Sequence, residues 1–391
     1  RVCAVICEYN PFHLGHAYHL RAAREASGAD YVLCLMSGAL TQRGAFARHD
    51  KWLRARAALE NGADLVLELP TRFACAPAPD FASGGVALLS ALGVATHLSF
   101  GCEASALPLL SAAAALFKAE SPAFSAALRA RLADGLPYPR ARALAAEQAA
   151  GLPAALLAQP NAALALEYLQ ALPETIVPVP IARRGSGYHD ASLSALSSAT
   201  AVRAALARGD LPAALSAVPS PAPLQTAEAR GFVHEEEALT QALLYRLRTA
   251  SPDALAALYG MDEGWAPLLA AAQTCASREA LLDFVKTKRY TRARLSRLCA
   301  YALLDLSRDF AQAHRAPEYA RVLGFRRSAA PLLRAVKRRS TIPLVTKAAD
   351  FDRAHPLFAL DVRAQDLWSL GVSNPALRSS GRDFTTSPIL V

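Results

Sequence analysis

The chain has 391 residues, a net charge of +9 and 53% hydrophobic residues. A chain of this length is longer than one typical domain, so two or three domains are predicted. Every apolar run is cut by charge or proline well below the length of a bilayer span, so an integral membrane protein is excluded. Seven cysteines without a CxxC pair and the lack of a signal peptide indicate a protein of the reducing cytoplasm.

Short apolar runs alternate with helical patterns through the first part of the chain. Strands are predicted at 2–6, 30–36, 64–69, 96–100 and 176–181, and helices at 17–26, 50–61, 81–92 and 161–172. This βαβ alternation predicts an α/β fold with a doubly wound parallel sheet, whose ligands lie outside the carboxyl ends of the strands. The Ala- and Leu-rich stretch at about 104–160 is expected to be a helical insertion.

The turn after the first strand carries the tetrapeptide His13-Leu14-Gly15-His16. Unpaired N–H groups and the helix dipole make the start of the following helix an anion site. Two imidazoles there can hydrogen-bond phosphate oxygens, and Gly15 lets a nucleotide approach the backbone. This H-x-G-H pattern is the signature of nucleotidyltransferases that attack the α-phosphate of ATP, so we predict His13 and His16 to be catalytic.

The same segment has a second interpretation as a metal site. His13, His16 and His19 recur every three residues, and a catalytic zinc takes three protein ligands. The turn at Gly15 displaces His13 from the regular helical face, which favours the phosphate site over zinc. We therefore predict no protein-bound metal, and His19 is expected to be a partly buried helix residue.

A second polar constellation follows the fifth strand. Ser197, Ser198 and Thr200 precede an amphipathic run and predict a helix N-cap, with Arg203 one turn into the helix. By itself this is an ordinary capped helix. At the end of a nucleotide-binding sheet, the hydroxyls and the cation can hold β- and γ-phosphates. Asp50 and Lys51 are either substrate residues or a solvated helix start.

The positive charge is concentrated in the second half of the chain. Residues 1–230 hold 19 Lys and Arg against 17 Asp and Glu, whereas residues 231–391 hold 23 against 16. We divide the chain into a nucleotide-binding domain at 1–211, a Pro-rich linker at 212–229 and a mainly helical basic domain at 230–391. The uneven charge indicates a polyanionic partner of the last domain.

Two clusters of cations lie in this basic domain, and each is either a solvated helix face or an RNA-phosphate contact. Tyr290 is either a core residue or a platform for an unpaired base. The predicted RNA-binding residues are Lys286, Lys288, Arg289, Tyr290, Arg292, Arg294, Arg297, Arg326, Arg327, Lys337 and Arg338.

Ten motifs follow one another in a fixed order. They are E-Y-N-P-F-H-x-G-H (8–16), M-S-G (36–38), Q-R-G (42–44), D-K-W (50–52), D-L-V-L-E-L-P (64–70), F-G-C-E (100–103), Q-P-N (159–161), R-R-G-S-G-Y-H-D (183–190), S-S-A-T-A-V-R (197–203) and K-T-K-R-Y-T-x-x-R (286–294). In this set the chain resembles the bacterial tRNA(Met) cytidine acetate ligases, which have a nucleotidyltransferase-like (HUP) fold.

The resemblance implies an enzyme that activates acetate with ATP as acetyl-adenylate and acetylates the wobble cytidine of elongator tRNA(Met), forming N4-acetylcytidine. Mg²⁺ is expected to accompany ATP, mainly with water and phosphate ligands. The ATP-binding residues that it implies, with the capping residues above, are Cys7, Glu8, Tyr9, Asn10, Pro11, Phe12, His13, Leu14, Gly15, His16, Ala17, Tyr18, His19, Gly101, Asn161, Arg183, Arg184, Ser197, Ser198 and Thr200. Arg203 is expected to act with the arginine pair on the departing pyrophosphate.

Two other functions share parts of this pattern. A small-molecule adenylyltransferase or pantothenate-synthetase-like acid–amine ligase would use the same H-x-G-H sheet, but it needs no basic second half. A non-catalytic RNA-binding protein with a decayed nucleotide site would not be expected to keep His13, Gly15, His16 and Arg203.

Overall fold

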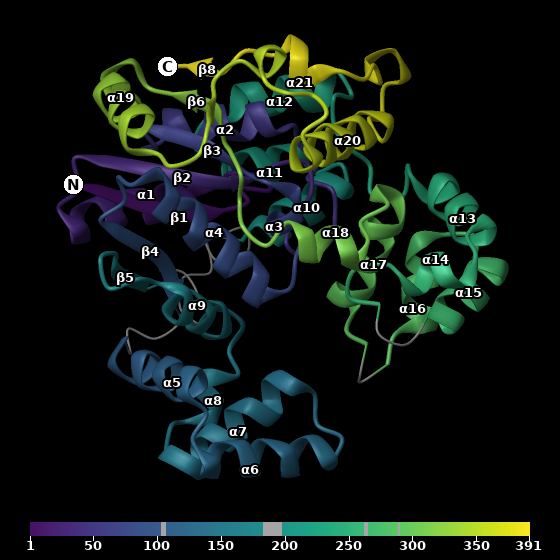
Figure 1. Ribbon diagram of the computed structural model, residues 1–391. Helices are drawn as coiled ribbons and strands as arrows, with labels where there is room; N and C mark the ends of the chain where they lie inside the picture. The colour runs from purple at the N-terminus through teal and green to yellow at the C-terminus, as the bar shows by residue number, and fades with distance from the viewer. Residues whose placement is uncertain (103–106, 183–197, 262–264, 288–289) are drawn as a thin grey trace.

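The computed structural model describes the chain except for residues 103–106, 183–197, 262–264 and 288–289. Its centre is one sheet in the order β5-β4-β1-β2-β3-β6-β7, with β8 paired to β6 (Figure 1). The strands are β1 (Val2–Cys7), β2 (Tyr31–Ser37), β3 (Leu65–Leu69), β4 (His97–Cys102), β5 (Val177–Ala182), β6 (Ala320–Phe325), β7 (Leu344–Val345) and β8 (Ile389–Leu390). The first five are parallel and cover the five predicted strands, which confirms the predicted α/β class.

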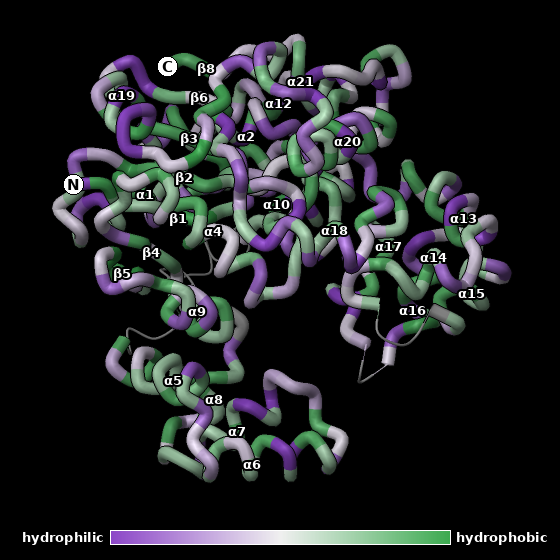
Figure 2. Tube along the Cα trace, in the orientation of Figure 1, coloured by the Kyte–Doolittle hydropathy of each residue, from purple (hydrophilic) through white to green (hydrophobic). Residues whose placement is uncertain are grey.

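Alternate residues of each central strand face opposite layers of helices. In β1, Val2 and Ala4 belong to one hydrophobic cluster, and Cys3 and Val5 to another. One face is covered by α1 (Leu14–Ser27) and α2 (Lys51–Glu60). The other is covered by α3 (Thr71–Ala74), α4 (Ala78–Leu92), α19 (Ala330–Arg339) and α20 (Pro356–Leu370). Burial on both faces explains why the strands read as continuous apolar runs, visible as hydrophobic segments at the centre of Figure 2.

The connection from β4 to β5 is helical, as expected for the insertion. It contains α5 (Leu107–Ala119), α6 (Pro122–Ala133), α7 (Tyr138–Ala150), α8 (Ala154–Leu157) and α9 (Pro160–Ala171). In Figure 1 α5–α8 form a lobe below the sheet, while α9 lies between this lobe and β4. Their apolar residues continue the cluster of the adjacent sheet face, so the lobe shares a core with the sheet.

The segment predicted as a linker is folded. Most of residues 212–229 lie within α11 (Leu211–Ser216) and α12 (Pro221–Ala229), which follow α10 (Ala199–Ala207). Prolines occupy the first turns of α11 and α12, where the missing N–H is no loss, so Pro here marks helix starts and not a linker. The carbonyl of Ala217 accepts the Leu14 N–H at 2.9 Å, which ties this helical group to the start of α1.

The C-terminal part begins with a helical lobe that ends at residue 313, and beyond it strands and helices alternate. It contains α13 (Thr240–Thr249), α14 (Pro252–Ala256), α15 (Trp265–Thr274), α16 (Arg278–Val285), α17 (Arg292–Leu304) and α18 (Arg308–Ala313), which form the lobe on the right of Figure 1. Beyond them β6 returns to the sheet, antiparallel to β3, and α21 (Arg382–Thr385) precedes β8. The sheet is therefore not confined to residues 1–211, which corrects the predicted boundary.

Candidate active site

A cavity of about 940 Å³ opens at the carboxyl ends of β1, β4 and β5. The strand order reverses between β1 and β4, and open α/β sheets bind ligands at such a point. Residues of the H-x-G-H segment line the cavity together with residues from β4, β5, α4, α9, α10 and α17. Among them are Cys7, Glu8, Tyr9, Asn10, His13, Gly15, His16, Tyr18, His19, Gln42, Arg43, Phe81, Phe100, Gly101, Tyr168, Ser198, Arg203 and Ala293.

The two imidazoles of the H-x-G-H segment cap α1. Nδ1 of His13 accepts the Gly15 N–H at 3.0 Å, and Nδ1 of His16 accepts the His13 N–H at 3.3 Å. The ring centroids lie 3.8 Å apart. Because both Nδ1 atoms act as acceptors, each neutral imidazole carries its proton on Nε2 and can donate there. The pair and the helix N-terminus can therefore bind a phosphate anion.

His19 lies one turn further along α1 and pairs with a buried serine. Its Nε2 is 3.0 Å from Oγ of Ser99 on β4. It is partly buried, as expected, and it lines the cavity, where it was predicted among the ATP-binding residues. Within the described ranges, no group of three or more His, Cys, Asp or Glu residues could hold a metal ion.

Arg203 reaches the turn after β1 from α10. Its Nη1 donates to the carbonyl of Asn10 at 2.5 Å and its Nη2 to Thr200 Oγ1 at 3.2 Å. Ser198 caps α10 by accepting the Ala201 N–H at 3.1 Å, which confirms the predicted cap. Burial lowers the pKa of Arg203, although Glu8 and Glu236 raise it. The structure thus brings Ser198 and Arg203 of the second constellation to the same cavity as the two histidines.

A fully buried arginine holds the ends of β1 and β2 together. Arg54 of α2 donates to the carbonyls of Glu8 at 2.6 Å, Ser37 at 3.0 Å and His49 at 3.0 Å, and also to that of Gly38. Burial lowers its pKa to about 10. Four backbone carbonyls fixed by one side chain keep the cavity rim in place, a role that the sequence did not indicate.

Not every predicted nucleotide-binding residue reaches the cavity wall. Pro11, Phe12, Leu14, Ala17 and Thr200 are not among its lining residues; Phe12 lies in the core of the α1 face. A Cβ added at Gly101 would meet no atom within 4 Å, so its neighbours do not require glycine there. Arg183, Arg184 and Ser197 lie outside the described residues, and Asn161 is in the first turn of α9.

Several lining residues were missed by sequence reasoning. Phe81, Phe100 and Tyr168 read as ordinary core aromatics, because their helix and strand patterns carry no functional signal. Gln42 and Arg43 belong to the Q-R-G motif, which did indicate them as part of the family pattern. Gly44 has φ +79°, and a Cβ there would lie 2.3 Å from the Arg297 nitrogen, so only glycine fits this close approach to α17.

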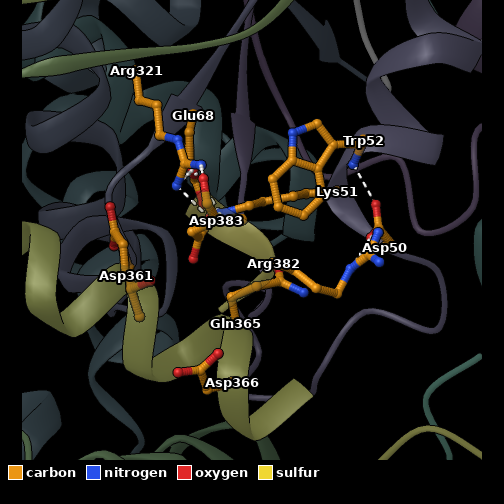
Figure 3. Close-up of polar contacts among 12 residues, drawn as sticks. Asp50, Lys51, Trp52, Glu68, Arg321, Asp361, Gln365, Asp366, Arg382 and Asp383 are labelled. Carbon is orange, nitrogen blue, oxygen red and sulfur yellow. Dashed lines mark hydrogen bonds and ion pairs between the residues drawn. The ribbon is translucent and has the colours of Figure 1, made fainter. Parts of the chain in front are cut away.

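Asp50 and Lys51 lie outside the cavity lining, and neither is solvated. Asp50 caps α2 and accepts from Arg382 Nη2 at 2.7 Å. Lys51 Nζ lies 2.7 Å from Glu68 and 2.8 Å from Asp383, and Arg321 contacts both acids at 3.4 and 2.5 Å (Figure 3). These four buried side chains, Lys51, Glu68, Arg321 and Asp383, form a closed ring of ion pairs, which we call the charge ring.

The charge ring lies directly behind the loop that leads to the cavity. A Cβ added at Gly38 would be 2.1 Å from Oε1 of Glu68, so the M-S-G glycine makes room for the ring. Asp361 lies beside it, accepting the Thr71 N–H at 2.6 Å and the Tyr319 hydroxyl. Burial, and then the charge of Glu68, raise the pKa of Asp361 to about 7.

The raised pKa of Asp361 predicts a pH-dependent stability. A folded-state pKa above the unfolded value near 3.9 makes the native state bind the proton more tightly. The stability that this proton contributes to the native state is present at low pH and is lost as pH rises towards 7. Asn at position 361 stays neutral, so Asp361→Asn does not lose this stability as pH rises. We therefore expect the free energy of unfolding of the variant, minus that of wild type, to increase from pH 5 to pH 8. Chemical denaturation across this range measures it, and a pH-independent difference would contradict it.

The first cluster of predicted RNA-binding residues is largely occupied by internal contacts. Arg292 pairs with Asp283 at 2.7 Å and with Glu279, Arg294 donates to the Gly260 carbonyl at 3.0 Å, and Arg297 donates to that of Gln42 at 3.2 Å. Tyr290 packs against the core of the helical lobe and lies 4.9 Å from the Arg294 guanidinium. Lys286 is exposed, and Lys288 and Arg289 lie outside the described residues.

The second cluster lies at the opposite end of the strands from the cavity. Phe325 of β6 pairs with Leu65, the first residue of β3, so Arg326 and α19 begin at the amino ends of the parallel strands. Arg326 donates to the Leu59 carbonyl at 2.7 Å. Exposed cations follow it, namely Arg327, Arg334, Lys337, Arg338 and Arg339, which we call the α19 surface. No described helix is long and apolar enough to cross a membrane.

Comparison with known proteins gives one consistent result. The model of the HIGH Nucleotidyl Transferase family matches residues 1–383. Proteins named tRNA(Met) cytidine acetate ligase from Syntrophomonas wolfei and Syntrophotalea carbinolica are each 36% identical, over 99% and 100% of this chain and 99% and 98% of theirs. The crystal structure of Thermotoga maritima TmcAL bound with alpha-thio ATP matches with a TM-score of 0.91 at 30% identity, covering 100% of this chain and 99% of the other. The chain therefore belongs to the tRNA(Met) cytidine acetate ligase family of HIGH nucleotidyl transferases.

Proposed function

We propose that this protein activates acetate with ATP and transfers the acetyl group to the wobble cytidine of elongator tRNA(Met). The observation that carries the proposal is the meeting of His13, His16 and Arg203 at one cavity, although His16 and Arg203 are 187 positions apart in the sequence. Family membership supports the choice of acetate and tRNA over the acids and amines of related ligases. Seven unpaired cysteines, six of them buried, support action in the cytoplasm.

The adenylation step requires positioning and charge stabilisation more than covalent help from the protein. The acetate oxygen attacks the α-phosphorus in line, and pyrophosphate leaves. His13 and His16 donate from Nε2 to the α- and β-phosphate oxygens, and the start of α1 adds its N–H groups. Arg203 holds the leaving pyrophosphate, together with Arg183 and Arg184. Gly101 leaves space beside the nucleotide, and Asn161 completes the family set.

Mg²⁺ enters this scheme as part of the ATP substrate. Glu8 is the acidic residue among the lining residues of the cavity, and no described cluster supplies a set of carboxylate ligands. Phosphate oxygens and water, the ligands that Mg²⁺ ordinarily takes in nucleotide sites, would therefore complete its shell.

One labelling experiment tests the function. The protein is incubated with labelled acetate, ATP and bulk tRNA, and both pyrophosphate release and label in tRNA are followed. Label in N4-acetylcytidine after nuclease digestion supports the proposal. Pyrophosphate release that needs a different acid identifies a small-molecule ligase, and the absence of both products identifies a non-catalytic RNA-binding protein.

The α19 surface predicts a separate electrostatic contribution to tRNA binding. We expect Lys337→Ala with Arg338→Ala to lower the affinity and to reduce the slope of log K against log salt by about 1 for each lost phosphate contact. Lys347→Ala is the matched control, since Lys347 is also exposed but pairs with Asp350 at 3.1 Å. Filter binding at several salt concentrations measures the slopes. Equal slopes in the double variant and wild type would exclude the surface from the tRNA footprint.

A further inference from the structure

Glu8 is the acidic residue that lines the cavity in the described part of the chain. It follows the last residue of β1, and His13, His16 and Gln42 line the same cavity. Its Oε1 accepts the N–H of Gln42 at 2.6 Å, and its side chain is partly exposed to the cavity. One carboxylate oxygen therefore has a fixed partner, which orients the group at the cavity wall.

The Gln42 peptide connects Glu8 to the basic helical lobe. The carbonyl of Gln42 accepts from Arg297 Nη1 at 3.2 Å, and Gly44 lies against the backbone of Arg297. Ala293, on the same helix α17, lines the cavity. Glu8 is thus linked through Gln42 to α17, which contributes Ala293 to the wall of the same cavity.

The environment makes Glu8 a stronger base than a solvated glutamate. Burial raises its pKa, and this effect exceeds the opposing hydrogen bond from Gln42 and the positive charges of Arg203, Arg54 and Arg43. A general base works best when its pKa lies near the working pH. The histidine pair is less suited to this task, because its Nδ1 atoms already accept backbone N–H groups and its Nε2 atoms are donors.

The second half-reaction needs a base at this place. The exocyclic amine of cytidine is a weak nucleophile, since its lone pair is delocalised into the ring. It must lose a proton as it forms the amide.

We propose that Glu8 is the general base of acetyl transfer, accepting a proton from N4 of the cytidine as it attacks the acetyl-adenylate. A C–N bond forms at the acetyl carbon, the C–O bond to the phosphate breaks, and AMP leaves with that electron pair. The proton passes from N4 to the Glu8 carboxylate and then to water. This role rests on the proposed function, since it assigns a residue to its second step.

The test compares Glu8→Gln and Glu8→Asp with wild type in the full-length protein. Glutamine keeps an oxygen that can accept the Gln42 N–H, so it preserves the structural contact while removing the base. Adenylation is measured as acetate-dependent ATP–pyrophosphate exchange, and transfer as single-turnover labelling of tRNA with acetate. Both are measured across pH, and circular dichroism checks the fold.

We expect Glu8→Gln to slow transfer by about 10²- to 10⁴-fold, the usual contribution of a general base, and to slow adenylation less than tenfold. Wild-type transfer should rise with pH and level off above the Glu8 pKa, and this limb should vanish in Glu8→Gln. Glu8→Asp, which keeps a carboxylate, should recover part of the rate.

Two results would overturn the assignment. One is an acetyl-transfer rate in Glu8→Gln equal to that of wild type, which would make the residue purely structural. The other is equal loss of adenylation and transfer, which would place Glu8 in the ATP site. If wild type itself neither exchanges pyrophosphate nor labels tRNA, the proposed function fails, and that outcome is distinguishable from both.

Discussion

His16→Ala is expected to lower acetate-dependent ATP–pyrophosphate exchange by about 10²- to 10³-fold, the usual effect of removing one preorganised donor from a site of developing charge. The imidazole of His16 lines the cavity beside His13, and its Nδ1 accepts the His13 N–H. The substitution therefore removes a donor to phosphate and weakens the cap of α1. Binding of tRNA should stay near normal, because the exposed basic residues lie on other elements.

His16→Gln separates the two roles of this side chain. Glutamine at the third helical position can still accept the N–H of the capping residue, as in an ordinary capping box, but it cannot donate from the position of Nε2. Both variants should lose exchange to a similar degree, while the glutamine variant keeps the thermal stability of wild type. Full exchange in His16→Gln would show that the imidazole serves α1 and not the nucleotide.

Asp383→Ala is expected to destabilise the protein by about 3–5 kcal/mol, the cost of breaking a buried ion pair on one side. Asp383 contacts Lys51 at 2.8 Å and Arg321 at 2.5 Å, and Lys51 and Arg321 are 1% and 3% exposed. Removing this carboxylate leaves two buried cations with Glu68 as the remaining acid of the ring. Calorimetric melting at neutral pH measures the effect.

Asp350→Ala provides the matched control. Asp350 is exposed and pairs with Lys347, so its loss should change stability by less than about 1 kcal/mol. If the melting temperature of Asp383→Ala fell no further than that of Asp350→Ala, the charge ring would contribute nothing to stability. Methionine is apolar and similar in length to lysine. In a Lys51→Met background, the stability lost on adding Asp383→Ala should be smaller, since one of the two buried cations left without a partner is gone.

The parallel half of the sheet could be predicted because its strands are buried on both faces and read as apolar runs. Strand β6 was missed for the opposite reason. Its sequence, Ala-Arg-Val-Leu-Gly-Phe, places a charge at the second position of the strand, and that charge is tolerated only because Asp383 and Glu68 meet Arg321 in the interior. No local pattern carries this information.

The histidine pair, Arg203 and the cap at Ser198 were predicted from motifs that stay close to the backbone, at a turn or at a helix start. The basic cluster at 286–297 was harder to interpret, because a cation on a helix looks the same whether it faces RNA or holds a carbonyl. Arg294 and Arg297 hold carbonyls. Substituting Arg292 and Arg294 to test RNA binding would therefore damage the lobe, whereas the α19 surface offers cleaner substitutions.

The return of β6 to the sheet has a consequence for how the polypeptide is made. Strand β3 is complete at Leu69, but its neighbour on that side begins at Ala320. During synthesis at about 5–20 residues per second, β3 waits on the order of ten seconds or more with a bare hydrogen-bonding edge. Such an edge invites pairing with other nascent chains. We expect ribosome-bound fragments ending before residue 320 to depend on chaperones, and full-length release to end that dependence.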